Sequence, residues 1–154
     1  MQSRLFAGIV AGLIAGVVFG VMMQMMTAPT PQGGQMPMMV MVAMVVGSMS
    51  VAVGWIYHLF NSAVIGAIFG WLFGRRAVTT GSGLGWGALY GVAWWILGAQ
   101  ILMPLALHMA PFSSVMMPPM RMVAMGSLVG HVMYGLILGG LFPVFARSAR
   151  PVTS

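Results

Sequence analysis

The sequence predicts an all-α integral membrane protein whose four transmembrane helices run up, down, up and down in a single bundle. Three observations lead to this fold class. Of the 154 residues, 60% are hydrophobic and only 4% are charged, whereas about a quarter of the residues in a soluble domain are charged. Four apolar stretches are long enough to cross the hydrocarbon core, which takes about 20 helical residues. The few cationic side chains flank these stretches mainly on one side.

We expect the four spans at residues 5–26, 49–73, 84–105 and 122–146. The apolar segment that leads into the second span begins at Met38 and is too long for a single crossing. We therefore expect a break near Gly47 and Ser48. A short interfacial helix over residues 38–46 would precede the break.

The arginines predict the orientation of the bundle. One side of the predicted spans carries five of the six: Arg4, Arg75, Arg76, Arg147 and Arg150. Only Arg121 falls on the other side. Because cationic residues concentrate on the cytoplasmic side of membrane proteins, both termini are predicted to be cytoplasmic.

Missing residue types exclude several functions. The chain contains no Asp, Glu or Cys, so it has no carboxylate acid–base pair, no carboxylate cage for Mg²⁺ or Ca²⁺, and no thiol nucleophile. We therefore predict that it is not an enzyme. The six arginines are scattered and form no basic stripe, so nucleic acid is not an expected partner.

The chain contains an internal repeat. Met41–Met44 (Met-Val-Ala-Met) recurs as Met122–Met125, and a histidine follows each copy. After the histidines, His58, Gly66 and Phe69 recur at the same offsets as His131, Gly139 and Phe142. Both halves would run from inside to outside and back, which predicts two similar helical hairpins related as a parallel repeat. The alternative is chance similarity in an apolar sequence of low complexity.

Glycines recur at four-residue intervals in the predicted spans. Small residues at this spacing let helix backbones approach closely in lipid. Contacts within the bundle, with other membrane subunits or with a second copy are therefore predicted at Gly8, Gly12, Gly16, Gly20, Gly66, Gly70, Gly87, Gly91, Gly135 and Gly139.

His58 and His131 are predicted at equal depth in the outer leaflet, because they precede Arg75 and Arg147 by 17 and 16 residues, or about 25 Å of helix. An ionisable group inside a span suggests function. One hypothesis is a b-type haem ligated by both imidazoles, with Arg121 meeting a propionate. The alternatives are a metal ion or another pigment, and a structural role in which each ring hydrogen-bonds across the bundle.

Of the 19 methionines, 14 lie in three clusters at the outer ends of the predicted spans, at residues 22–26, 36–44 and 116–125. Thioether ligands suit Cu(I). A second hypothesis is therefore a copper site built from His108, Met116, Met117, Met36 and Met38. The alternative is that these flexible side chains only fill gaps in apolar packing.

Two short motifs carry a resemblance. One is Gly54-Trp55…His58…Ser62…Gly66 and the other is His131…Tyr134-Gly135…Leu138-Gly139. Together they resemble a family of small four-helix bacterial inner-membrane proteins that has no assigned activity. The resemblance implies the same architecture and location for this chain, in a bacterial inner membrane, and it implies no function.

From these observations we expect a non-catalytic accessory or scaffold subunit. Glycine-rich helix faces would pack it, in the lipid bilayer, into a larger and energy-converting membrane complex. A haem b- or Cu(I)-binding membrane protein is the alternative. A small transporter is the weaker alternative, because no span carries the polar stripe that a pore requires.

Overall fold

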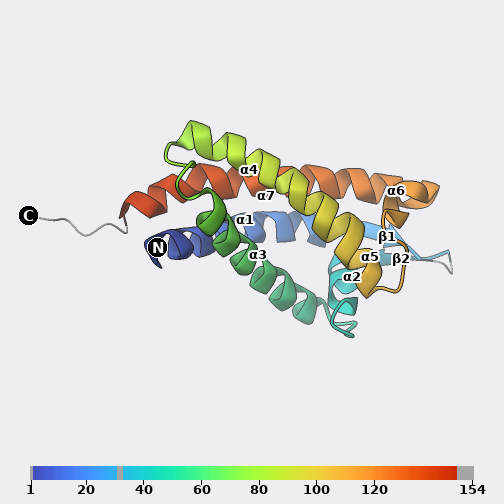
Figure 1. Cartoon of the computed structure of the whole chain (residues 1–154). Coiled ribbons are helices and arrows are strands. Elements are labelled where there is room, and N and C mark those ends of the chain that lie inside the picture. The colour runs from blue at the N-terminus through green and yellow to red at the C-terminus, as the bar shows by residue number, and fades with distance from the viewer. Residues whose placement is uncertain (1, 31–32, 149–154) are drawn as a thin grey trace, which may run out of the picture.

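The structure is a computed structural model that describes residues 2–30 and 33–148 (Figure 1). Arg150, counted above among the inner arginines, lies outside these residues. The elements in chain order are α1 (Gln2–Gln24), β1 (Thr27–Pro29), β2 (Gln35–Pro37), α2 (Met38–Met44), α3 (Val51–Phe73), α4 (Thr80–Trp94), the π-helix η1 (Trp95–Leu102), α5 (Met103–Ala106), α6 (Ser113–Met116), the 3-10 helix η2 (Pro118–Met120) and α7 (Arg121–Ser148).

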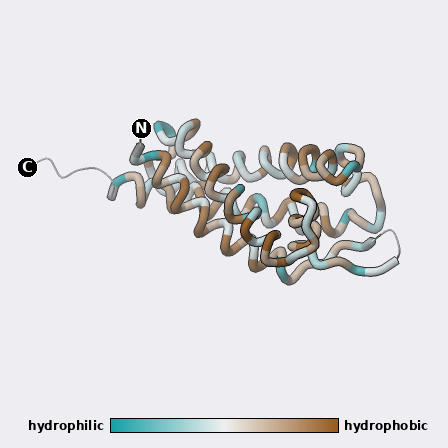
Figure 2. Tube along the Cα trace, turned by 90° about the horizontal axis from the view of Figure 1, so that it is seen from below, coloured by the Kyte–Doolittle hydropathy of each residue, from teal (hydrophilic) through white to brown (hydrophobic). Residues whose placement is uncertain are grey.

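Four helical segments are long and apolar enough to cross a membrane: Ser3–Gln24, Val51–Phe73, Thr80–Ala106 and Pro118–Arg147. This confirms the predicted helical class and its four apolar helices. Successive segments run in alternating directions, and the start of α1, the α3–α4 connection and the end of α7 lie at one end of the molecule (Figure 1). Hydrophobic residues extend along the helices, and hydrophilic residues concentrate near their ends (Figure 2).

Local chemistry sets where the helices begin and end. Between α2 and α3 the chain turns at Gly47, whose φ of +73° favours glycine. At the start of α4, the side chain of Thr79 accepts a hydrogen bond from Ser82 N and the side chain of Ser82 accepts one from Thr79 N. This capping box satisfies two backbone donors that the first turn leaves free.

The segment between α1 and α2 contains a short antiparallel hairpin. Ala28 of β1 lies opposite Met36 of β2. The chain reverses through Gly33, at φ +84°, and the Thr30 side chain accepts a hydrogen bond from Gly34 N. The buried Ala28 joins the hairpin to the core.

The third long segment is not one uniform α-helix. After Trp94 it widens into the eight-residue π-helix η1 and then becomes α5. Pro104 lacks an N–H, so the carbonyl of Gln100 cannot receive the usual hydrogen bond from four residues ahead. That carbonyl instead accepts a 2.7 Å hydrogen bond from Phe112 N. π-Helical turns are rare and occur frequently at functional sites.

Close packing joins α1 to α3, α4 to α7, and α1 to α7. In the first pair, a Cβ added to Gly12 would lie 2.9 Å from the Cα of Gly66, and one added to Gly8 would overlap the Gly66 carbonyl. In the second pair, Gly83 lies against the Gly139 carbonyl, and Gly87 lies against the Gly135 carbonyl. Corresponding positions of the two hairpins thus make corresponding contacts.

Pro143 inside α7 adds to the second interface. It cannot donate to the carbonyl of Gly139, four residues earlier, so that carbonyl lacks its usual helical partner. The same carbonyl faces Gly83 of α4 at a distance that leaves no room for a side chain. A close backbone approach of this kind permits Cα–H···O contacts.

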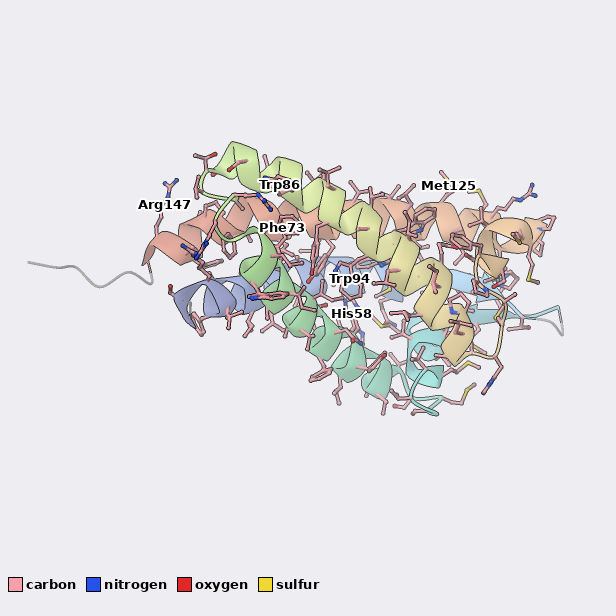
Figure 3. All side chains as sticks on the ribbon, in the orientation of Figure 1. His58, Phe73, Trp86, Trp94, Met125 and Arg147 are labelled. Atoms are coloured by element: carbon pink, nitrogen blue, oxygen red, sulfur yellow. The ribbon has the colours of Figure 1, made fainter. Side chains whose placement is uncertain are left out.

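Aromatic rings join α3 to α4 and to α7 near the arginine-rich end (Figure 3). Phe73 stacks on Trp86 with ring centroids 5.0 Å apart, and Phe69 meets Phe142 edge to face at 5.5 Å. The Tyr90 hydroxyl donates a 2.7 Å hydrogen bond to the Ile65 carbonyl. Beyond Tyr90, the space between α3 and the η1–α5 segment is occupied by a cavity.

Candidate functional site

A cavity of about 390 Å³ lies in the half of the bundle away from the α3–α4 connection. Its walls are the second half of α1, the first halves of α3 and α7, the short helix α2, and the segment η1–α5. Volumes of 300–1,000 Å³ are typical of small-molecule sites. The lining is mainly apolar and contains no arginine.

His58 stands on α3 and is buried. Its Nε2 lies 2.8 Å from the carbonyl oxygen of Gly16 on α1. A carbonyl oxygen only accepts hydrogen bonds, so Nε2 must carry the proton and donate it. The glycine at position 16 permits this close approach, since a Cβ there would meet the Ser62 side chain. In the neutral ring, the other nitrogen, Nδ1, is therefore an acceptor.

His131 lies on α7, and its ring nitrogens have the opposite roles to those of His58. Its Nδ1 lies 2.8 Å from the carbonyl oxygen of Ser127, one helical turn earlier. By the same reasoning Nδ1 donates, and Nε2 is the acceptor of the neutral ring. The two histidines thus each use one nitrogen to bond a backbone carbonyl and keep the other available.

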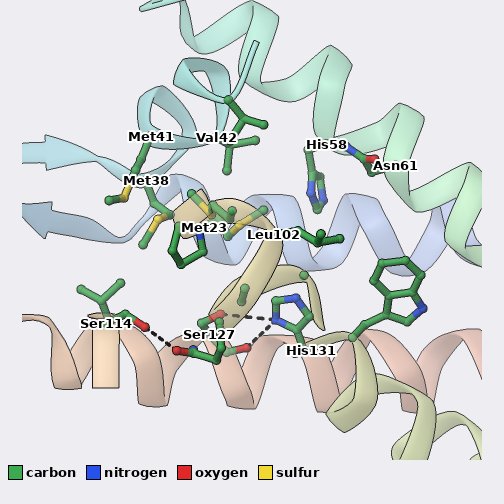
Figure 4. Close-up of a pocket in the computed structure, with 18 of the residues that line it drawn as sticks. Met23, Met38, Met41, Val42, His58, Asn61, Leu102, Ser114, Ser127 and His131 are labelled. Carbon is green, nitrogen blue, oxygen red and sulfur yellow. Dashed lines mark hydrogen bonds between the residues drawn. The ribbon is translucent and has the colours of Figure 1, made fainter. Parts of the chain in front are cut away.

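The two imidazoles point into the cavity from opposite walls (Figure 4). Phe19 of α1 contacts both of them edge to face, with ring centroids 5.6 Å from His58 and 4.9 Å from His131. A further contact joins α7 to α3, because the Tyr134 hydroxyl donates a 2.8 Å hydrogen bond to the Ser62 carbonyl. The relative position of the walls is therefore held by specific polar contacts.

Three polar side chains lie at the η1–α6 side of the cavity. Gln100 of η1 is almost completely buried. Its Oε1 accepts a 2.6 Å hydrogen bond from the Ser114 hydroxyl. Ser113 is 8% exposed, and its Oγ is the one fully enclosed side-chain N or O atom in the described residues that lacks a hydrogen-bond partner. Leaving such a hydroxyl unpaired costs about 1–3 kcal/mol. Ser113 is therefore an unsatisfied polar group packed beside the cavity.

Methionine thioethers form much of the remaining wall. The lining methionines come from α1, α2, η2 and the region around α5: Met23, Met26, Met38, Met41, Met103, Met109 and Met120. Thioethers adapt to irregular shapes and make favourable contacts with aromatic rings. These flexible side chains can therefore adapt to the shape of a flat apolar molecule in the cavity.

The haem hypothesis places both Nε2 atoms on one iron, and the structure arranges the rings differently. Nε2 of His58 is bonded to Gly16, and Phe19 packs against both imidazoles. Arg121 is exposed, donates from Nε to the Val115 carbonyl, and does not line the cavity. These residues do not fit a shared bis-imidazole haem as they stand. The hypothesis stays a prediction that this geometry does not favour.

The residues predicted for copper are not brought together at the cavity. Met38 is buried and lines it. Met116 and Met117 are exposed, Met36 is half-buried on β2, and His108 is exposed in the turn after α5. Nowhere in the described ranges do three His, Cys, Asp or Glu side chains gather as metal ligands.

All ten glycines predicted to make helix contacts do so within the chain. A Cβ at any of them would come within 3 Å of an atom from another helix: Gly8, Gly12, Gly16, Gly20, Gly66, Gly70, Gly87, Gly91, Gly135 and Gly139. The faces that were candidates for contact with other subunits are thus filled by the chain's own helices.

Sequence reasoning missed several residues of the cavity. Phe19, Gln100, Ser113 and Ser127 were not singled out for it, nor were most of the lining methionines. Gln100, a polar side chain within an apolar span, is the signal that could have found this region. Comparison with known proteins finds no matching family model, no similar curated protein and no similar solved structure.

Proposed function

We propose that this chain is an integral membrane protein that binds a small, largely apolar molecule in the cavity between His58 and His131. The observation that carries the proposal is the pair of imidazoles, each fixed by one backbone carbonyl and each presenting its second nitrogen to a mainly apolar space. A few placed polar groups in an apolar cavity are the usual composition of a ligand site.

The outer surface of the bundle supports insertion in a membrane. Ile56, Phe60 and Trp71 on α3 and Leu89 on α4 are each more than 60% exposed. Large contiguous apolar surfaces are rare on soluble monomers. In a bilayer these side chains would contact lipid, and the cavity would be accessible from the side, since Leu102 on its wall is 49% exposed.

We propose that both termini are cytoplasmic, in a bacterial inner membrane. Arg4 on the first turn of α1, Arg75 and Arg76 after α3, and Arg147 near the end of α7 belong to the same end of the bundle. Arg121, at the start of α7, belongs to the other. The cavity would then lie in the outer half. Reporter domains joined at Thr80 and after the last residue are expected to be cytoplasmic, and a periplasmic report from either would reverse or break this orientation.

The binding proposal is tested with bromodurene, a brominated tetramethylbenzene, added to the purified protein in detergent. Trp94 lines the cavity, so a bromine atom bound there should quench tryptophan fluorescence with a saturable dependence on concentration. Ala124 also lines the cavity and is 3% exposed. We expect Ala124→Phe to fill the space and weaken this binding by about tenfold or more, in keeping with direct steric exclusion.

The control for that variant is Val129→Phe, on the same helix at a position that is 60% exposed. It adds a phenylalanine outside the cavity and should leave the saturable quenching unchanged. Equal, non-saturating quenching in the wild type and both variants would mean that the probe only dissolves in the detergent. That result would rule out the proposed ligand-binding function.

The accessory-subunit hypothesis predicts a different result for the same titration. A chain that only supports a larger complex needs no saturable site for a small molecule. Its main motivation was glycine-rich faces free for partners, and the predicted glycines contact the chain's own helices. For this reason we place ligand binding first and contact with other subunits second.

A further inference from the structure

The hydrogen bonds of the two histidines determine which kind of polar group a ligand in the cavity must carry. This selectivity presupposes the ligand site proposed above. Nε2–H of His58 goes to Gly16 and Nδ1–H of His131 goes to Ser127, each at 2.8 Å. Both ring protons are thus directed at backbone carbonyls and not at the cavity. What remains for a ligand is one lone pair on each ring.

The chain's composition keeps the rings neutral. There is no Asp or Glu anywhere in the 154 residues, so no acidic side chain can compensate an imidazolium in this apolar space. A buried charge without a counter-charge is very costly. The nearest ring to both imidazoles is that of Phe19, which offers no hydrogen bond. The free nitrogens therefore act as acceptors.

The free nitrogens are not fully enclosed by the packing around them. In the described residues, Ser113 Oγ is the one enclosed side-chain N or O atom without a partner, so neither free imidazole nitrogen is sealed off by packing. Both rings line the cavity and point into it (Figure 4). Two acceptors on opposite walls suit a molecule that carries hydroxyl donors.

We propose that the cavity selects phenols and hydroquinones: molecules with a flat apolar body and one or two hydroxyl groups that donate to His58 Nδ1 and His131 Nε2. The aromatic side chains of Phe19, Tyr57 and Trp94 and the methionines of the lining suit the flat body. The same site disfavours the oxidised quinone, because its carbonyl oxygens would meet nitrogen lone pairs where the reduced form has O–H donors.

Three probes of nearly the same shape test this inference: duroquinol, with two hydroxyl donors; duroquinone, with two acceptors; and durene, with neither. Binding is measured as the rise in the thermal unfolding midpoint, followed by circular dichroism under anaerobic, reducing conditions for duroquinol. We expect duroquinol to bind at least about tenfold more tightly than durene, and duroquinone more weakly than durene.

Two variants remove the acceptor from the position of the free ring nitrogen, because the amide oxygen lies elsewhere, and keep the structural hydrogen bonds. In His58→Gln, the side-chain amide can replace Nε2–H toward Gly16, and in His131→Asn it can replace Nδ1–H toward Ser127. Each variant should lower duroquinol affinity by about tenfold toward that of durene and leave durene binding unchanged. His108→Asn is the control, because His108 is exposed and does not line the cavity, and asparagine tolerates its φ of +57°.

The outcomes separate this inference from the proposed function. If none of the three probes binds, the ligand site itself is wrong. If all three bind equally, or if duroquinone binds best, the site stands and its selection of hydroxyl donors is overturned. If the histidine variants lower durene and duroquinol binding together, the imidazoles only shape the cavity, and the inference fails.

Discussion

Replacing Gly12 by leucine is expected to destabilise the bundle by at least about 3 kcal/mol, the upper part of the range for overpacking. A Cβ at this position would lie 2.9 Å from the Cα of Gly66 and would overlap the carbonyl oxygen of Ser62. Both are backbone atoms of α3, so no side chain can rotate away to make room. The α1–α3 interface would have to separate, and with it the wall that carries His58.

The matched control is Gly85→Leu on α4, where an added Cβ meets nothing within 4 Å. There the same substitution replaces the poorer helix former and should leave stability equal or slightly higher. The measurement is the midpoint of thermal unfolding in detergent, with size-exclusion chromatography to detect aggregation. Equal midpoints for the Gly12 and Gly85 variants would show that close contact of α1 with α3 does not hold the bundle together.

The helical class could be predicted from the sequence because it depends on signals that are local in the chain. Long apolar stretches and prolines mark helices and their ends, and glycine at every fourth position marks a face that can approach another backbone. The turn at Gly47 lies where the apolar segment becomes too long for one crossing. Each of these features depends on neighbouring residues and on few long-range contacts.

The candidate site depends on contacts between residues far apart in the chain, and only part of it could be foreseen. Equal spacing from the arginines indicated that His58 and His131 share a depth. Which nitrogen each ring uses depends on the Gly16 and Ser127 carbonyls, and one of these belongs to a helix 42 residues away. Phe19 carried no signal, since a phenylalanine in an apolar span is typical of lipid contact as well as of a core.

The π-helix and the cavity show the same limitation. Pro104 indicates a helix disturbance, and it does not specify whether the segment bends, ends or widens. In the structure the segment widens into a π-helix over Trp95–Leu102. The free Gln100 carbonyl accepts a hydrogen bond from Phe112 N. The sequence shows the methionines as clusters along the chain. Which of them line the same cavity depends on how the helices pack against one another. Met23 and Met103, from different helices, line one space.

The central claim is that each imidazole donates one proton to a backbone carbonyl and offers its other nitrogen to a ligand. Nitrogen NMR of protein labelled only at histidine tests it most directly. Protonated and unprotonated ring nitrogens resonate far apart, and the chain has only three histidines, so single-histidine variants assign the spectrum. We predict His58 as the Nε2–H form and His131 as the Nδ1–H form. Addition of duroquinol should shift the unprotonated nitrogen of both rings and leave His108 unchanged. Opposite tautomers, or unprotonated nitrogens that do not respond to duroquinol at a concentration that saturates the thermal shift, would contradict the account.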